Sequence, residues 1–237
     1  MKKISILIFA VFSCLLCSAQ NEIEVGGRSK KNNGLSANKL VLALEGAGSI
    51  TTFSDKNEFF NKENTVGFKF GVTGLYRIAP RVEMGLGINL AQYRHSFYSN
   101  LSQTRFDQID QNNYINVKPY IHIVSKSTNS IKPFVSIGLF GGYLVKSKYK
   151  STNSVTLEST SYDATEFYNR INAGVEGGVG LKINLTSNKT VYIKATYELG
   201  LTTITRKEDL LPQANNNFLP LKTNALNLYL IYPIFSL

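Results

Sequence analysis

Eight segments of this sequence alternate apolar residues with small or polar ones, and no other feature limits the possible folds as strongly. Residues 82–91, for example, read Val-Glu-Met-Gly-Leu-Gly-Ile-Asn-Leu-Ala. A period of two predicts a β-strand whose two faces meet different surroundings. The segments span residues 40–50, 65–78, 82–91, 114–126, 132–145, 170–183, 191–201 and 222–235. The sequence therefore predicts an all-β fold; Tyr229, Ile231 and Phe235 interrupt the last alternation and leave its facing open.

The connections between these segments alternate in length. Short connections at 79–81, 127–130 and 186–189 alternate with long ones at 51–64, 99–113, 147–167 and 203–221. Alternate connections of consecutive antiparallel strands lie at opposite ends of a sheet, so all the long ones are expected at one end. This asymmetry predicts an eight-stranded antiparallel up-and-down transmembrane β-barrel with long extracellular loops and short periplasmic turns. A three-residue turn at 79–81 would set Ile78 opposite Val82 and Arg77 opposite Glu83.

The two faces indicate which side meets lipid. A soluble barrel of the lipocalin type is the rival, because it also alternates its strands but lines its cavity with the apolar face. Here one face is almost continuously Leu, Ile, Val and Phe, whereas the other carries isolated charges among glycines, which does not suit a cavity for an apolar ligand. The charges expected inside are Glu45, Lys69, Arg77, Glu83, Lys118, Arg170, Glu176, Lys182, Lys194 and Glu198. Because side chains nearly fill a barrel of eight strands, we interpret these charges as a paired network, with a conduction path as the alternative.

The first residues predict export. Lys2 and Lys3 precede an apolar stretch that ends in small residues at 18–19, so residues 1–19 are predicted to be a signal peptide. Residues 20–38 are polar and aperiodic and predict a flexible periplasmic lead-in, which leaves 39–237 for the barrel. Cys14 and Cys17 both lie in the leader, so the mature chain is expected to form no disulfide. A lipidated Cys14 is the alternative.

Composition excludes several classes of protein. The chain has 237 residues, of which 18% are charged, and it lacks the apolar run of about 18 residues that a transmembrane helix needs. The formal net charge of +10 becomes 26 − 2 − 16 = +8 without the two leader lysines. Because no stripe of cations interleaved with aromatics accompanies this charge, nucleic acid is not an expected partner. Lys146, Lys148 and Lys150 are expected to face anionic head groups or sugar phosphates, or to be simply solvated.

Neither histidine is placed for catalysis. His95 and Ser96 are neighbours in a strand and point to opposite faces, so they cannot share a proton. His122 is expected near the turn end of its strand and His95 near the loop end of another, too far apart to share a metal ion. The glycines of 174–180 have no helix after them, as a phosphate-binding loop requires. No enzymatic activity, cofactor or metal is therefore expected.

Three glycine-rich strand segments carry a family resemblance. They are KPFVSIG at 132–138, AGVEGGVG at 173–180 and YELGLTTI at 197–204, and the leader ends in Ser18-Ala19-Gln20. Together they resemble the PorT-like outer-membrane β-barrel domain of Bacteroidetes over residues 38–237. The resemblance implies an outer-membrane barrel of that phylum. It carries no catalytic residues to transfer, and the link of one relative to protein secretion is not extended to this chain.

These patterns predict a small outer-membrane barrel that acts as a structural or interaction protein and displays four extracellular loops. Its expected partners are outer-membrane lipid and a protein or surface polymer bound by the loops. A narrow channel for small solutes is the second hypothesis, and an outer-membrane lipid-modifying enzyme is the third. The sequence does not indicate an oligomeric state.

Overall fold

The computed structural model describes residues 40–54, 61–101, 104–126, 130–186, 189–205 and 221–236. The predicted signal peptide and lead-in lie outside these residues. The elements are β1 (Leu40–Ser54), β2 (Asn61–Glu63), β3 (Thr65–Ala79), β4 (Val82–Leu101), β5 (Thr104–Val124), β6 (Ile131–Asn153), β7 (Ser159–Asp163), the 3₁₀ helix η1 (Thr165–Phe167), β8 (Ile171–Thr186), β9 (Lys189–Gly200) and β10 (Lys222–Ser236). Within the described part of the chain, no helix is long and apolar enough to cross a membrane.

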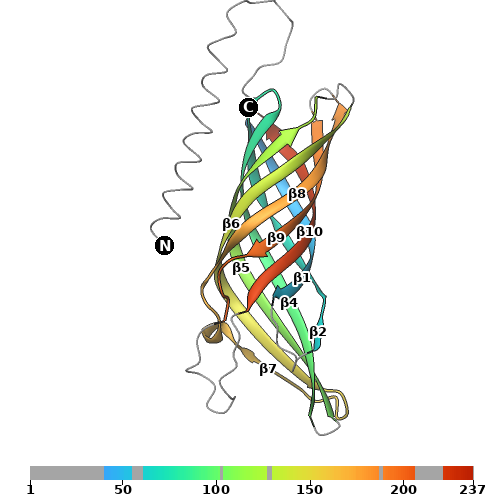
Figure 1. Cartoon of the computed structure of the whole chain (residues 1–237), viewed down its shortest axis with the longest axis vertical. Helices are drawn as coiled ribbons and strands as arrows, with labels where there is room; N and C mark the ends of the chain where they lie inside the picture. Colours follow the sequence, from blue (N-terminus) through green and yellow to red (C-terminus); the bar gives the residue numbers. More distant parts are fainter. Residues whose placement is uncertain are drawn as a thin grey trace, which may run out of the picture.

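Eight of these strands close into a ring. Antiparallel pairing runs β1–β3–β4–β5–β6–β8–β9–β10 and returns from β10 to β1, and the strands lie tilted around the barrel axis (Figure 1). Every alternating segment is a strand of this ring, so the predicted eight-stranded up-and-down barrel is confirmed. Closure leaves no edge strand within the barrel, as a membrane-spanning sheet requires.

The apolar face of each strand points outward. Val66, Leu228 and Ile137 are 68%, 62% and 61% exposed, and comparable side chains surround the barrel on every strand of the ring. A soluble protein rarely exposes a contiguous apolar surface of this extent. The inward face instead carries buried polar and charged residues. This facing is the reverse of a lipocalin and fits a barrel whose outer surface meets lipid.

A β-bulge changes the details of the register predicted at the first short turn. The β3–β4 turn has two residues, Pro80 and Arg81, rather than three, and Ala79 pairs with Val82. Ile78 is therefore bulged instead of lying opposite Val82, and this extra residue is what restores the predicted pairing of Arg77 with Glu83. The prediction of a three-residue turn was wrong because it did not consider a bulge.

A second bulge explains one of the three interruptions in the last strand, Phe235, whereas Tyr229 and Ile231 are apolar residues at inward positions. Tyr229 and Ile231 are buried inside the barrel, whereas Ile234 and Phe235 are both exposed. Ala43 pairs with Pro233 and Leu42 with Phe235, so Ile234 is the extra residue. The bulge reverses the facing of the strand after it, which a single alternating pattern cannot express.

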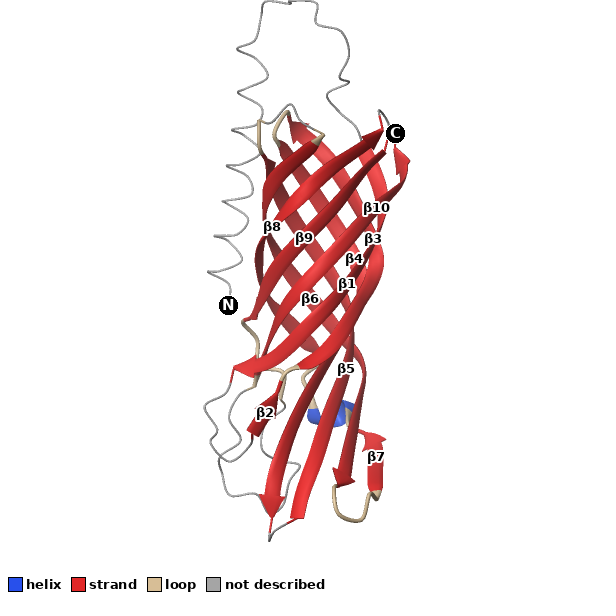
Figure 2. Cartoon of the chain, turned by 90° about the vertical axis from the view of Figure 1, so that its right-hand side faces the viewer, coloured by secondary structure: helices blue, strands red, loops and turns tan. Residues whose placement is uncertain are grey.

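Two segments predicted as long loops are largely strands. The β4–β5 ladder continues to the pair Leu101–Thr104, and β6 continues to Asn153 with β7 beside it. Together with β2, these strands form a sheet that projects beyond the closed barrel (Figure 2). We call this projection the extracellular extension, after the orientation predicted from the lengths of the connections. The sequence conceals it, because no lipid requires an apolar face outside the membrane and the residues of 107–113 are mostly Asp, Asn and Gln, which are depleted in strands.

Candidate functional site

The barrel interior is lined by the inward positions of all eight strands. Four lysines and four glutamates among the described residues are buried there, namely Lys69, Lys118, Lys182, Lys194, Glu45, Glu83, Glu176 and Glu198. Arg77 joins them with a side chain that is 29% exposed. Arg170 does not: it precedes β8, its side chain is exposed, and its guanidinium lies 3.5 Å from the Leu144 carbonyl oxygen. Its placement inside the barrel was wrong because the regular ladder of β8 starts only at Ile171.

One cluster of the interior centres on Glu198. Lys69 Nζ lies 2.5 Å from Glu198 Oε2, and the Tyr93 hydroxyl donates to the same oxygen at 3.0 Å. The Asn116 amide in turn donates to the Tyr93 hydroxyl at 3.1 Å. These residues come from β3, β9, β4 and β5, so the cluster ties strands on opposite sides of the ring.

A second cluster joins Glu45 to Lys118. Lys118 Nζ lies 3.4 Å from Glu45 Oε1 and donates to the Tyr229 hydroxyl at 2.8 Å. The Asn89 amide donates to Glu45 Oε1 at 2.5 Å. The Tyr229 hydroxyl lies 3.5 Å from Glu198 Oε1, so this cluster is continuous with the first.

A third ion pair lies between β9 and β8. Lys194 Nζ is 3.3 Å from Glu176 Oε1. The same ammonium lies 4.2 Å from the ring centre of Tyr120 and 4.7 Å from that of Tyr229, distances at which a cation is attracted to an aromatic face. The aromatic rings therefore both fill the interior and help to compensate its buried cations.

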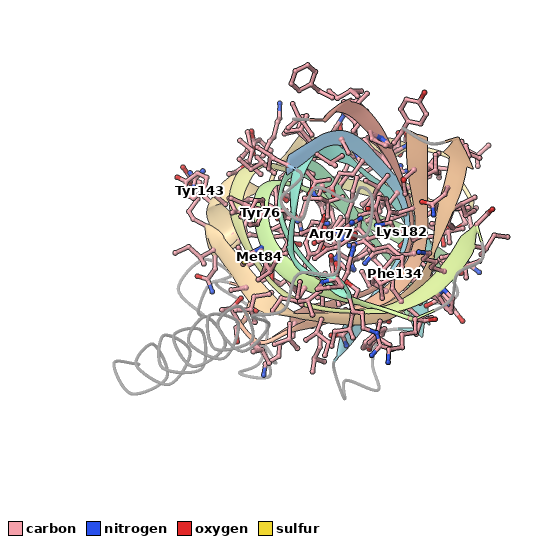
Figure 3. The ribbon with its side chains drawn as sticks, turned by 90° about the horizontal axis from the view of Figure 1, so that it is seen from above. Tyr76, Arg77, Met84, Phe134, Tyr143 and Lys182 are labelled. Carbon is pink, nitrogen blue, oxygen red and sulfur yellow. The ribbon has the colours of Figure 1, made fainter. Side chains whose placement is uncertain are left out.

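The pair Glu83 and Lys182 lies toward the turn end of the barrel. Lys182 Nζ donates to Glu83 Oε1, whereas Arg77 Nη2 lies 3.8 Å from the same oxygen. Figure 3 shows Arg77 and Lys182 within the ring of strands and Tyr143 outside it. The cross-strand neighbour inferred from the turn is thus the weaker partner of Glu83. The closer partner, Lys182 on β8, is 99 residues further along the chain. The sequence indicated that Lys182 faces inward, but not that it meets Glu83.

Apolar clusters lie on both sides of the central charges, and the one at the turn end surrounds the Glu83–Lys182 pair. One contains Leu75, Tyr120, Val124, Phe134 and Tyr192, toward the turn end. The other contains Tyr93, Tyr114, Leu144, Ala164, Tyr168 and Ile204, toward the extracellular extension. Ala164, Tyr168 and Ile204 belong to connecting segments that fold back over the barrel mouth. The described interior is therefore filled by side chains rather than open.

A separate polar site lies within the extracellular extension. Asp110 is buried, pairs across the β4–β5 ladder with His95, and accepts a hydrogen bond from the Tyr168 hydroxyl. Burial raises the pKa of Asp110 to about 6, and the Tyr168 hydrogen bond opposes that rise. Burial also lowers the pKa of His95 to about 3, so this imidazole is neutral at pH 7. The Asp110–Tyr168 contact fastens the segment that caps the barrel mouth to β5.

The two histidines lie far apart. His95 is opposite Asp110 on β5, twelve residues from His122 on the same strand, or about 40 Å at about 3.3 Å per residue. His122 packs against the rings of Phe134 and Tyr120, with centroids 4.3 and 4.8 Å away. Over the described ranges, no group of three or more His, Cys, Asp or Glu side chains could hold a metal ion.

Comparisons with known proteins give a family match and several distantly similar structures. A family model described as outer membrane protein beta-barrel domain matches residues 19–206. No curated protein sequence matches the chain. Among solved structures, Neisserial surface protein A has 11% sequence identity and a TM-score of 0.44, covering 85% of this chain and 100% of its own. The outer membrane protein OprG of Pseudomonas aeruginosa has 12% identity and a TM-score of 0.41, covering 86% and 96%.

Proposed function

The chain belongs to the outer membrane protein beta-barrel domain family, and from this premise we propose that it is a non-conducting interaction protein that presents its extracellular extension to a partner outside the cell. Its location is the outer membrane, as the family indicates, and the outward apolar surface of the barrel suits a lipid environment. The observation that carries the proposal is the extension itself. A structure that only anchored or spanned the membrane would not need β4, β5 and β6 to continue as a hydrogen-bonded sheet beyond it.

The extension offers a preorganised surface. Its strands are held by continuous ladders, and a β6–β7 loop with exposed Val155 and Leu157 forms one of its tips. Leu157 has a φ of 58°, a left-handed conformation that costs a non-glycine residue roughly 1–2 kcal/mol. Large apolar side chains at an exposed tip, one of them on strained backbone, favour contact with a protein or surface polymer.

A channel for small solutes is the less favoured function. The four buried lysines and four buried glutamates form ion pairs with each other, and aromatic clusters lie on both sides of the central pairs. Ions could pass only if several of these contacts opened together. Enzymatic activity is not proposed, because His95 and His122 lie about 40 Å apart along the β4–β5 ladder and cannot act in one site.

Affinity capture from intact envelopes tests the proposed function. The wild-type chain is compared with a variant in which residues 97–108, the outer part of the β4–β5 hairpin, are replaced by a short Asn-Gly turn. We expect both to be recovered as folded barrels and only the wild type to retain its crosslinked partner. Retention of the same partner by the shortened variant would exclude this hairpin as the binding surface.

We further propose the finer assignments that the sequence suggested. Residues 1–19 are a cleaved signal peptide, residues 20–38 a periplasmic lead-in and residues 39–237 the barrel. The family member that the chain resembles is the PorT-like domain of Bacteroidetes. N-terminal sequencing of the protein purified from outer membranes tests the cleavage site: a mature chain that begins at Gln20 or Asn21 is expected, and a lipidated Cys14 would replace this assignment with a lipoprotein.

A further inference from the structure

Three lysines form a ladder on the outer surface of β6. Lys146, Lys148 and Lys150 are exposed, whereas Leu144 and Ser147 are fully buried. Strict alternation from Tyr143, which faces outward, would place these lysines inside. They lie outside because the pairing with β5 shifts between Asn113 and Tyr114, which leaves Val145 as the extra residue of a β-bulge. Both Val145 and Lys146 consequently face outward.

A side-chain contact and a regular ladder on its far side stabilise this bulge. The Asn113 side-chain amide lies 3.4 Å from the Lys146 carbonyl oxygen and compensates part of the disturbed ladder. Beyond the bulge the pairing of β5 with β6 resumes, with Gln111 opposite Lys148 and Ile109 opposite Lys150. A bulge that re-aims the following side chains is a recurrent device next to binding sites. Here its effect is to turn three cations away from the barrel axis.

The ladder begins where the apolar belt ends. Tyr143 and Val145 are 56% and 50% exposed, and Lys146 follows directly. From Lys146 to Lys150 the strand rises about 13 Å along its own axis, or about 10 Å along the membrane normal at a tilt of about 40°. The polar head-group layer on each side of a bilayer is about 5–8 Å thick. The three ammonium groups therefore span the height of the external head groups.

The surroundings of the ladder are also basic. On the same outward face, β4 contributes Arg94, which pairs with Gln111 and so lies in the row of Lys148. The exposed Arg170 precedes β8 and interacts electrostatically with Asp163, the cross-strand partner of Lys148. Asp163 pairs with Lys148 and lies close enough to Lys146 and Arg170 for electrostatic interaction, and the exposed Glu166 lies in η1, which packs beside β6. These two negative charges do not offset three lysines and two arginines. The patch carries an excess of positive charge at the depth where lipid phosphates lie.

We propose that Lys146, Lys148 and Lys150 bind the phosphate groups of anionic lipids in the external leaflet. This inference rests on the proposed function for its orientation, because it requires the extension to project outside the cell. A lipid fits the patch better than a soluble polyanion does, since the first lysine adjoins side chains that face acyl chains. Long lysine side chains can reach from such positions into the head-group layer.

The test measures lipid selectivity of the full chain. The protein, folded in detergent, is incubated with equal amounts of phosphatidylglycerol and phosphatidylcholine, and native mass spectrometry gives the ratio of the two lipids retained. Each lysine near an anionic surface contributes a factor of about five. We expect the triple variant K146Q/K148Q/K150Q to lose at least about ten-fold of the preference for phosphatidylglycerol. The matched variant K146R/K148R/K150R is expected to keep it.

Two further measurements distinguish binding of lipid at these lysines from other causes of the preference for phosphatidylglycerol. In the variant R81Q/K126Q, which removes two exposed cations at the turn end, a smaller loss is expected; an equal loss would show that net charge alone sets the preference and would overturn the proposal. Heparin, a soluble polyanion without acyl chains, should displace bound phosphatidylglycerol only weakly. Complete displacement at matched charge concentration would assign the ladder to a soluble partner instead of a lipid.

Orientation is measured separately. T156C, at the β6–β7 loop, is exposed to a membrane-impermeant maleimide on intact cells, in a chain whose other cysteines, Cys14 and Cys17, lie in the predicted leader. Labelling together with unchanged lipid selectivity in the glutamine variant would overturn the lipid proposal and leave the proposed function standing. Absence of labelling in cells whose lysate is labelled would overturn the proposed function and this inference with it.

Discussion

The charged residues of the interior stabilise the barrel as ion pairs, and Glu83 is the clearest case. Its carboxylate forms ion pairs with two cations from different strands, Lys182 and Arg77. A buried charge that loses its partner retains the cost of its desolvation, whereas removal of both partners can be nearly neutral. The side chains inside the barrel are therefore better understood as matched sets than as separate contributions to stability.

Replacement of Glu83 with Gln should destabilise the barrel by about 3 kcal/mol, because Lys182 would remain buried without a counter-charge. The double variant E83Q/K182M should recover much of this loss, since it removes the stranded charge. Denaturant unfolding in detergent micelles measures both. Glu158→Gln, on the exposed β6–β7 loop, is the control and should change stability by less than about 0.5 kcal/mol. Equal losses in the single and double variants would contradict the pairing.

Asp110 predicts a pH effect of defined sign. Its pKa is raised from 3.8 to about 6 by burial, so the native state retains a proton that the unfolded state has released between about pH 4 and pH 6. Stability from this residue is full below the unfolded value and falls as pH rises through the folded one, by about 3 kcal/mol. The lowered pKa of His95 acts in the opposite direction, because an unfolded histidine binds a proton that the buried one does not.

A comparison of wild type with Asp110→Asn isolates the carboxyl group from that histidine. The two proteins should have similar free energies of unfolding at about pH 4, and Asp110→Asn should be the more stable one at about pH 8. Thermal unfolding across this range provides the measurement. A constant difference at all pH values would show that Asp110 titrates normally in the folded protein.

Strands of the barrel fit together through glycines that face aromatic rings. A Cβ atom added to Gly85 on β4 would lie 2.2 Å from Tyr120 Cζ, and one added to Gly180 on β8 would lie 2.4 Å from Phe134 Cζ. The rings lie across the positions that the absent side chains would occupy. This arrangement lets two large aromatic residues pack inside a barrel of only eight strands, and it explains part of the glycine content of the inward faces.

Gly85→Ala should therefore destabilise the barrel by about 1–3 kcal/mol, because Tyr120 must leave its position and disturb its hydrogen bond with Thr73. Gly46→Ala is the matched control on β1, where an added Cβ has no neighbour within 4 Å and should have little effect. The measurement compares the denaturant midpoints of unfolding of the two variants and the wild type in the same detergent. Equal midpoints would contradict the packing role of Gly85.

The whole molecule combines a closed interior with a projecting sheet. Because each of the four buried lysines is paired with a buried glutamate and apolar clusters lie on both sides of the central pairs, the barrel should show no steady conductance in planar bilayers. A reproducible open channel whose ion selectivity changes in Glu176→Gln or Lys118→Gln would contradict the filled interior and make the channel the better function. Gel migration that differs between boiled and unboiled samples verifies that the protein tested is folded.

Much of this architecture follows from the sequence alone, because lipid outside and polar contacts inside act on each residue of a strand separately. Each strand therefore alternates apolar with polar or small residues. This alternation predicts the number of strands, the side of each that faces lipid, and most of the charges in the interior. The lengths of the connections similarly indicated which end projects. Bulges account for several departures from the alternation, among them those at Ile78, Val145 and Ile234.

Tertiary structure alone decided which interior charges meet. Lys69 and Glu198 are 129 residues apart, and Lys182 and Glu83 are 99 residues apart, so their contacts depend on closure of the ring and on the stagger of its strands rather than on any local pattern. The extracellular extension was equally hidden from the sequence. Outside the bilayer no apolar face is required, and those strands are held instead by backbone ladders to which polar side chains such as Gln108 and Asn112 contribute no periodic signal.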